Sequence, residues 1–224
     1  MAIGSIMNPG FPPALIFLLG AGCVPLLKGR AKAGFMLLLP VLSLAVLASI
    51  PCGIHWGVDF LDYQLVLGRV DRLSLAFGYI FTIVSFLSLL FALNVKDDLQ
   101  HVAGLCYAGG ALGVTFAGDL FSLYIFWEIM AVASSFLILA RRTERAQSAA
   151  YRYILVHIFG GLCFLAGIVL YLQKTGSLEF AYIGLEGPAS FLIFVGIALN
   201  AAVPPLHSWL QDAYPEATVT GAVF

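Results

Sequence analysis

This sequence of 224 residues contains little charge. Lysine and arginine number 11 and aspartate and glutamate number 12, so charged residues make up 10% of the chain and the formal net charge is −1. Soluble domains carry about a quarter charged residues, whereas 61% of this chain is hydrophobic. The composition therefore excludes a soluble fold, and the near-zero net charge excludes a basic surface that would recruit nucleic acid.

Cysteine is also scarce, and its spacing indicates no metal cluster. The cysteines show neither a CxxC pair nor a group of neighbouring His and Cys residues, so we interpret them as small packing residues and expect no metal and no cofactor. The motifs of soluble enzymes are missing as well: there is no P-loop, no GxGxxG after a strand, no HExxH and no GxSxG. We therefore expect no catalysis in the ordinary sense. The cysteines are Cys23, Cys52, Cys106 and Cys163.

Long apolar runs dominate the chain instead. A helix needs about 20 mostly apolar residues to cross a bilayer, because every backbone polar group must find its partner within the segment. Pro40 predicts a kink in the second run, and Pro204 and Pro205 predict the end of the seventh. The predicted fold class is all-α, a polytopic bundle of about seven transmembrane helices with a discontinuous seventh helix, in a single domain. The expected spans are 6–27, 33–50, 73–93, 102–117, 120–140, 149–172 and 189–203, with 204–224 forming a half-helix after the break and the start of a truncated next span.

The loops between these runs carry an asymmetric set of basic residues. Cytoplasmic loops of membrane proteins are enriched in Lys and Arg. If all seven runs span the membrane, eight basic residues fall on one side and three on the other, so we expect the amino terminus to face outward. The larger group is Lys28, Arg30, Lys32, Lys96, Arg141, Arg142, Arg145 and Arg152, and the smaller group is Arg69, Arg72 and Lys174.

Two further segments have patterns of their own. Residues 53–72 mix apolar, polar and turn-forming residues, which is typical of a short hairpin on the membrane surface. The fourth run carries Gly109, Gly113 and Ala117 at every fourth position. Such a stripe of small residues lets another helix approach closely, so we expect this helix to be buried.

Glu128 is the only acidic residue deep within an apolar run, LFSLYIFWEIMAVASSFLILA. The helical rise places it near the bilayer midplane. A carboxylate there is costly unless it is paired, protonated or exposed to water, so a functional role is the first hypothesis; the alternative is a neutral acid hydrogen-bonded within the bundle. Tyr124, Ala131 and Ser135 lie at helical spacing from Glu128, and this shared face should meet a cavity or another helix.

His157 in the sixth run is a second candidate. Tyr153 lies one turn before it, and Gly160 and Gly161 lie one turn after it. A lone histidine in a helix is most often a packing residue. A proton relay is the alternative, because imidazole titrates near neutral pH.

The stretch GIALNAAVPPLHSWLQDAYPEATVTGAVF joins a short apolar half-helix, a double proline and an amphipathic continuation. This pattern predicts a discontinuous helix. Broken helices at membrane depth are tolerated where the freed backbone lines a cavity or is buried in protein, and they commonly mark ion pathways. Asn200 is expected about one turn before the break, and His207 either takes part in transport or caps the break.

At these positions the sequence resembles the antiporter-like family shared by Mrp-type monovalent cation/proton antiporters, complex I and membrane-bound hydrogenases. VDRLSLAF, residues 70–77, resembles the start of the family's third span, and FWEIMAVAS carries its fifth-span glutamate. PPLHSWLQDAYPEATVTG resembles the seventh-span break, and DAYPEATVTGAVF is most similar to the D subunit of the Mrp-type antiporters. Together these motifs cover the chain from about Asp71 onward.

The resemblance implies roles for two of the candidate residues. In the family, a glutamate in the fifth span is paired with a lysine in the seventh, and charge movement between them gates proton transfer toward the next lysine or histidine. Glu128 matches the glutamate, but Asn200 stands where the family usually has the lysine, and a neutral amide cannot pair with a carboxylate by charge. The resemblance therefore implies either an altered proton path or an architectural role.

The resemblance also bears on the extent of the chain. Family members have about fourteen spans built as two inverted repeats. We therefore expect this chain to be the N-terminal half of an antiporter-like subunit, truncated or split from the remainder.

These observations lead to one leading hypothesis and two alternatives. We expect a subunit of a multisubunit cation/proton antiporter that moves H⁺ and a monovalent cation, Na⁺ or K⁺, with Glu128 as the titrating acid and onward transfer near Asn200, His157 or His207. The alternatives are a proton-pumping subunit of a complex I-like oxidoreductase or hydrogenase, and a non-transporting scaffold that packs through the fourth span. The expected partners are the lipid bilayer and other membrane subunits, and the expected location is the bacterial inner membrane.

Overall fold

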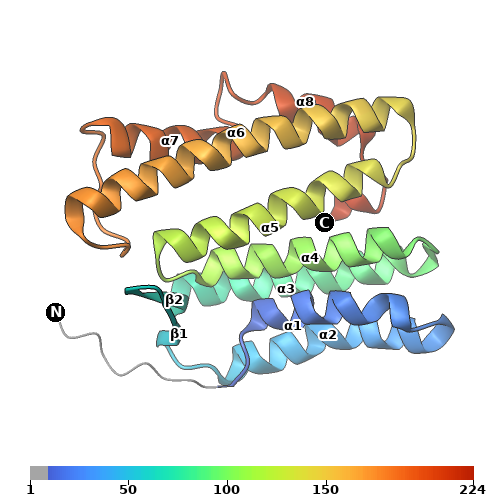
Figure 1. The fold of residues 1–224 in the computed structure, drawn as a ribbon. Coiled ribbons are helices and arrows are strands. Elements are labelled where there is room, and N and C mark those ends of the chain that lie inside the picture. The colour runs from blue at the N-terminus through green and yellow to red at the C-terminus, as the bar shows by residue number, and fades with distance from the viewer. Residues whose placement is uncertain (1–9) are drawn as a thin grey trace.

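The computed structural model describes residues 10–224, most of which are helical (Figure 1). The predicted helical class is confirmed, apart from one two-stranded sheet. The α-helices are α1 (Pro13–Cys23), α2 (Gly29–Ser49), α3 (Arg72–Phe91), α4 (Asp98–Phe116), α5 (Leu120–Leu139), α6 (Glu144–Thr175), α7 (Pro188–Asn200) and α8 (Ser208–Ala213). The strands are β1 (Gly53–Phe60) and β2 (Tyr63–Val70), and the 3₁₀ helices are η1 (Val24–Leu26), η2 (Ala92–Asn94), η3 (Tyr214–Glu216) and η4 (Gly221–Val223).

Capping residues determine where several helices begin and end. Asp71 and Ser74 form a capping box at the start of α3: the Asp71 carboxylate accepts from the Ser74 amide at 2.7 Å, and the Ser74 hydroxyl accepts from the Asp71 amide at 2.8 Å. Asp119 caps α5 by accepting from the Ser122 amide at 2.7 Å. Gly176 ends α6 in the left-handed region, with φ 69°. These contacts satisfy backbone groups that a helix end leaves unpaired.

Four helices, α2, α3, α5 and α6, are long and apolar enough to cross a membrane. α1 together with η1, and also α7, are apolar but shorter, and α4 begins with the polar residues Asp98, Gln100 and His101. A helix therefore overlaps each predicted range, while the count of seven spans stays a prediction. The expected start of the first span at residue 6 lies outside the described residues.

The helices run back and forth between two ends of the bundle (Figure 1). At one end, the hairpin formed by β1 and β2 meets the loop before α5, because the Val66 amide of β2 donates to the Asp119 carboxylate at 2.6 Å. The loop before α7 lies at the same end, since the Leu120 amide donates to one of its carbonyls at 3.0 Å. The Trp56 indole donates to the Gly10 carbonyl at 2.8 Å, which brings the segment before α1 to the same place. This end is termed the hairpin end.

Charged residues pair at the opposite end, termed the ion-pair end. Lys32 near the start of α2 pairs with Asp98 at the start of α4. Arg142, after α5, pairs with Asp97 at 3.0 Å. The loops after α1, α3 and α5 therefore meet at one end of the bundle, while their place on one side of a membrane stays a prediction.

Residues 53–70 form the predicted hairpin. β1 and β2 pair antiparallel, from Gly53 opposite Val70 to Phe60 opposite Tyr63. The side chain of Asp119 accepts a hydrogen bond from an amide of β2, so the hairpin is tied to the start of α5. It thereby covers the hairpin end of the bundle.

α4 lies in the middle of the bundle, in contact with α1, α3 and α5 (Figure 1). Its small residues allow this: a methyl group on Gly109 would come within 3.0 Å of the Ala14 carbonyl oxygen in α1, and one on Gly113 within 2.1 Å of the Phe126 ring in α5. The predicted burial of this helix is confirmed. Because both glycines are covered within the chain, their stripe does not offer a free face through which a scaffold would bind a partner.

The chain turns sharply between α7 and α8. α7 ends in a Schellman motif, in which the Val203 amide donates to the Ala198 carbonyl at 2.9 Å and the Ala202 amide donates to the Leu199 carbonyl at 3.1 Å. Ala202 has φ 52°, a left-handed conformation that glycine usually supplies. A cis peptide bond joins Pro204 to the next residue. α8 then packs against α6.

Candidate functional site

The carboxyl group of Glu128 lies at the contact between α5 and α6. Glu128 is half-buried, and a methyl group built on Gly161 of α6 would come within 2.1 Å of Oε1. Within residues 10–224, no side chain or backbone group forms a hydrogen bond or ion pair with this carboxyl group. Glu128 also lines an apolar groove of about 440 Å³ between α4 and α5. An acid in the middle of an apolar helix thus lies against another backbone without a polar partner to hold it.

His157 on α6 is buried in an aromatic cluster. Its side chain is 4% exposed, and its Nδ1 atom lies 2.9 Å from the Tyr153 carbonyl oxygen. The imidazole stacks on the Tyr153 ring, with centroids 3.9 Å apart, and packs nearly perpendicular to the Trp209 ring, with centroids 4.6 Å apart. The Tyr153 hydroxyl is hydrogen-bonded to the Ser134 hydroxyl of α5. The cluster therefore joins α5, α6 and α8.

Two contacts set the register of α5 against α6. Glu128 lies against Gly161, and Ser134 bonds to Tyr153. The two helices are antiparallel neighbours, so along α6 His157 lies between the contact at Gly161 and the bond at Tyr153. It is one turn, or about 6 Å, from Gly161. The structure thus brings two of the sequence-predicted residues, Glu128 and His157, to the same helix contact.

Asn200 and His207 occupy the turn between α7 and α8. Asn200 is the last residue of α7, and in the described part of the chain its side chain forms no hydrogen bond. His207 precedes α8, and its Nδ1 atom is buried without a hydrogen-bond partner. Trp209 connects this turn to His157, since its indole donates to the Leu199 carbonyl at 2.9 Å. The main chain at the end of α7 is therefore tied to the cluster through Trp209, and in the described residues neither the Asn200 side chain nor His207 Nδ1 makes a hydrogen bond to it.

A cavity of about 110 Å³ adjoins the cluster. This volume has room for several water molecules. Most of its lining is apolar, and the polar part comes from the hydroxyl-bearing side chains of Ser134, Tyr153, Tyr107 and Tyr214. It offers polar surface next to the two residues that connect α5 with α6.

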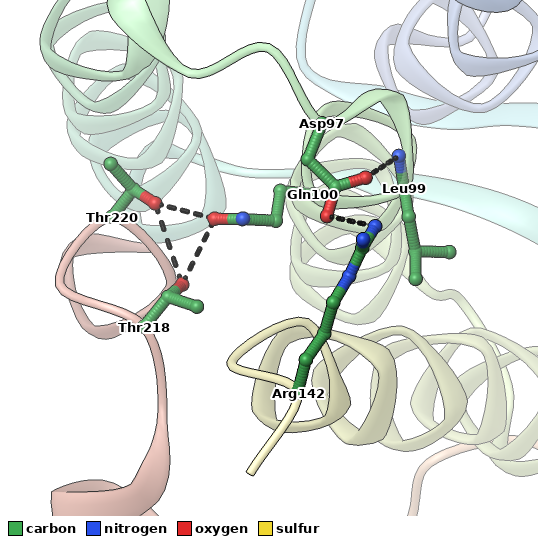
Figure 2. Close-up of polar contacts among 6 residues, drawn as sticks. All are labelled: Asp97, Leu99, Gln100, Arg142, Thr218 and Thr220. Atoms are coloured by element: carbon green, nitrogen blue, oxygen red, sulfur yellow. Dashed lines mark hydrogen bonds and ion pairs between the residues drawn. The ribbon is translucent and has the colours of Figure 1, made fainter.

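The segment after α8 crosses α5 and returns to the start of α4. Figure 2 shows the Gln100 side-chain oxygen accepting from the hydroxyls of Thr218, at 3.1 Å, and Thr220, at 2.8 Å. Beside it, Asp97 accepts from the Leu99 amide and pairs with Arg142. Residues after α8 are thus fastened to the ion-pair end, where they help to enclose the cavity.

The described residues offer few other groups that could bind a metal or react. Among residues 10–224, no group of three His, Cys, Asp or Glu side chains comes together to hold a metal ion. The four cysteines are unbridged, and Cys23 and Cys52 are exposed, so the interpretation of these two as packing residues is wrong. In water, burial would spare an apolar side chain the cost of exposure. A cysteine on an apolar segment that faces lipid does not incur that cost, so it need not be buried.

Sequence reasoning misses Ser134 and Trp209. It favours Ser135, which lies two turns from Glu128, but the Ser135 hydroxyl bonds to the Val132 carbonyl of its own helix at 2.7 Å. The one signal for Trp209 is its position two residues after His207, in the amphipathic stretch that follows the break.

Four helices long and apolar enough to cross a membrane are consistent with a multi-pass membrane protein. Residues 117–224 match the family described as NADH:quinone oxidoreductase/Mrp antiporter, transmembrane region. Residues 117–224 are thus similar to the antiporter-like family that the motifs predict.

Two Na⁺/H⁺ antiporter subunits are similar to this chain in sequence. The A subunit of the Na⁺/H⁺ antiporter of Alkalihalophilus pseudofirmus is 31% identical over 191 residues, which cover 78% of this chain and 23% of that protein. The A1 subunit of the Na⁺/H⁺ antiporter of Staphylococcus aureus is 28% identical over 185 residues, which cover 75% of this chain and 22% of that protein. The chain thus spans less than a quarter of the length of these relatives. Neither relative is a D subunit, so the assignment of this chain to the D subunit stays a prediction.

Two solved structures share the fold. A chain of the membrane-bound sulfane sulfur reductase, an archaeal respiratory membrane complex, superposes with a TM-score of 0.81 at 25% identity, over 94% of this chain and 48% of that one. A chain of respiratory complex I from Thermus thermophilus superposes with a TM-score of 0.71 at 23% identity, over 95% of this chain and 51% of that one. The fold described here is therefore about half of each of those chains.

Proposed function

We propose that this chain is a proton- and cation-translocating subunit of a multisubunit cation/proton antiporter, with Glu128 as its titrating acid. The exchanged ions would be H⁺ and a monovalent cation, Na⁺ or K⁺. The named relatives are Na⁺/H⁺ antiporter subunits, and their ions are carried over here as part of the proposal. Other membrane subunits of the same assembly would be its partners.

The observation that carries the proposal is the position of the Glu128 carboxyl group. It lies within α5, against the backbone of α6, and forms no hydrogen bond or ion pair within residues 10–224. Burying an ionised carboxylate without a partner is strongly unfavourable. The group therefore has reason to bind a proton, and its freedom from fixed partners lets it exchange that proton with a neighbour.

The proton route that we propose follows the α5–α6 contact. His157 is the neighbouring titratable group, one turn from Gly161 along α6. Ser134 and Tyr153 continue the polar path from His157 to the cavity of about 110 Å³. Asn200 and His207 flank the turn at the end of α7, where Asn200 replaces the lysine of the family with a neutral group that can bind water.

The orientation follows from the basic residues. We propose that the ion-pair end faces the cell interior and the hairpin end faces outward, in the bacterial inner membrane, because cytoplasmic loops are rich in Lys and Arg. Under this orientation the amino terminus lies outside, and all seven helical ranges span the membrane within one domain.

A second candidate function is proton pumping within a redox-driven complex. The superposition on a chain of an archaeal respiratory complex favours it. Glu128 and His157 would have the same tasks there, but the driving force would come from redox subunits. Copurification of the chain with subunits that carry iron–sulfur clusters would favour this candidate over an antiporter.

The test is ion exchange by the complete assembly in everted membrane vesicles. Glu128→Gln and Glu128→Ala are each expected to abolish cation-dependent proton movement, because neither side chain can carry a proton between sites. Glu186→Gln is the matched control, since Glu186 is an exposed acid in the loop before α7. Unchanged exchange in both Glu128 variants, with normal amounts of the chain in the membrane, would refute the proposal.

A further inference from the structure

Trp209 links the end of α7 to the imidazole ring of His157. Its indole N–H donates to the Leu199 carbonyl at 2.9 Å, one residue before Asn200. Its ring packs nearly perpendicular to the His157 imidazole, with a centroid distance of 4.6 Å and an interplanar angle of 80°. A shift of the α7 end would therefore move the indole and change the packing of the imidazole.

The imidazole has a defined tautomer in this arrangement. Its Nδ1 atom lies 2.9 Å from the Tyr153 carbonyl oxygen. A carbonyl oxygen only accepts hydrogen bonds, so Nδ1 must carry the hydrogen and donate it. In the neutral ring the lone pair then belongs to Nε2, which is the atom that can take up a proton.

α8 is held on α6 by two independent contacts. The Arg152 guanidinium forms a bidentate ion pair with Asp212, with N···O distances of 2.6 and 2.7 Å. The Trp209 ring meets the Tyr153 ring edge-on at 5.4 Å. Trp209 is therefore fixed from the α6 side as well as from the α7 side.

Few titratable groups face His157 from the helices around it. α6 contributes Tyr153 and α8 contributes the uncharged Trp209. α5 reaches the cluster through the Ser134 hydroxyl, which bonds to Tyr153, while Glu128 touches α6 at Gly161, one turn from His157. At the end of α7 the nearest polar side chain along the chain is Asn200. The orientation of the imidazole thus depends on packing and on one carbonyl rather than on a charged partner.

We propose that Trp209 is a positioning residue for proton transfer. It holds His157 in the tautomer whose Nε2 atom accepts the proton, and it couples that ring to the position of the α7 end. This inference rests on the proposed function, in which His157 exchanges a proton with Glu128. It assigns a specific task to a residue on α8 that does not itself titrate.

Three variants test the proposal in the complete assembly. Trp209→Phe keeps an aromatic ring but removes the N–H donor, and exchange should fall about fivefold, as expected for one lost hydrogen bond. Trp209→Leu also removes the ring and should lower exchange further. The control is Trp56→Phe, which removes an equivalent indole bond to a main-chain carbonyl at the hairpin end and should leave exchange unchanged.

A spectroscopic readout separates positioning from mere stability. Solid-state nitrogen NMR of histidine-labelled assembly, with His157 assigned by difference against His157→Gln, should show a neutral ring protonated at Nδ1. Trp209→Leu should convert this signal into a mixture of tautomers. The double variant His157→Gln with Trp209→Phe should exchange no more slowly than His157→Gln alone, because residues that act through one another are not additive.

The outcomes separate this inference from the proposed function. Wild-type exchange and a wild-type His157 signal in Trp209→Leu, while Glu128→Gln abolishes exchange, would overturn the role of Trp209 alone. Retained exchange in Glu128→Gln would overturn the proposed function. If Trp209→Leu fails to accumulate in the membrane, Trp209→Phe decides: an unchanged rate and tautomer there would equally overturn the inference.

Discussion

The carboxyl group of Glu128 on α5 lies directly against the α-carbon of Gly161 on α6. A methyl group at residue 161 would approach its Oε1 atom to 2.1 Å. A side chain at residue 161 would therefore push the carboxyl group aside, and the next residue along α6 toward His157 is a glycine too. The contact between Glu128 and Gly161 therefore determines where the carboxyl group lies relative to His157.

Gly161→Ala should displace the Glu128 carboxyl group and lower exchange by about tenfold or more, since misplacement by about 1 Å can cost that much in rate. Gly160→Ala is the matched control. A methyl group there would meet only the flexible end of the Leu199 side chain, at 3.2 Å. Exchange rates of the two variants should be compared in vesicles at equal protein levels. Equal rates would argue against a special contact at residue 161.

The sequence alone permits some of these assignments and not others. Glu128 stands out because a single acid within an apolar run is visible without a structure. The choice of Ser134 over Ser135 depends on how α5 is rotated against α6, and spacing within one helix carries no information about that rotation. The contacts of Trp209 cannot be predicted from the sequence for the same reason, since its partners, Leu199 and His157, lie on two other helices.

Helix boundaries show a similar limit. The apolar run predicts a sixth span that begins at residue 149, but α6 begins at Glu144. Thr143 caps it by accepting from the Ala146 amide at 3.1 Å. Apolar content marks the part of a helix that lipid can surround, whereas capping marks where the backbone becomes helical. The two need not coincide.

Removing the cap of α3 should destabilise the protein in a pH-dependent way. Asp71→Ala should lower the free energy of unfolding by about 1 kcal/mol at neutral pH. Hydrogen bonding from the Ser74 amide, with the nearby charge of Arg69, lowers the pKa of the Asp71 carboxyl group below its ordinary value. The cap therefore stabilises fully above the ordinary carboxyl pKa and loses its effect as the pH falls through the lowered one.

Unfolding in detergent at neutral and acidic pH measures this effect. The difference between the wild type and Asp71→Ala should shrink as the pH falls below about 4. Asp71→Asn is the control, because asparagine caps helices without an ionisable group, so its stability should not show this pH dependence. A constant difference between the wild type and Asp71→Ala across the whole range would contradict the assignment.

The ion pair between α6 and α8 should contribute little by itself. Arg152 and Asp212 are both partly exposed, and such pairs are weakened by water and by salt. Arg152→Gln is expected to cause a small loss of thermal stability that disappears in high salt. Arg145→Gln changes a neighbouring arginine that forms no ion pair within the described chain. A large, salt-independent loss in Arg152→Gln would show that the pair is more important than its exposure indicates.

The central position of α4 predicts a sharp difference between glycines. Gly113→Ala should destabilise the bundle by about 1–3 kcal/mol, because the added methyl group would overlap the Phe126 ring and overpacking has that cost. Gly34→Ala in α2 adds a methyl group to open space and should be neutral or slightly stabilising. Unfolding midpoints of both variants measure the difference. Similar midpoints would mean that the contact between α4 and α5 adapts easily.

The central claim is that Glu128 binds and releases a proton within the membrane. Infrared difference spectroscopy of the reconstituted assembly, between acidic and alkaline pH, reports this directly through the carbonyl stretch of a protonated carboxyl group. We predict a band that shifts in heavy water, disappears in Glu128→Gln and persists in Glu186→Gln. A Glu128→Gln spectrum identical to that of the wild type would contradict the claim.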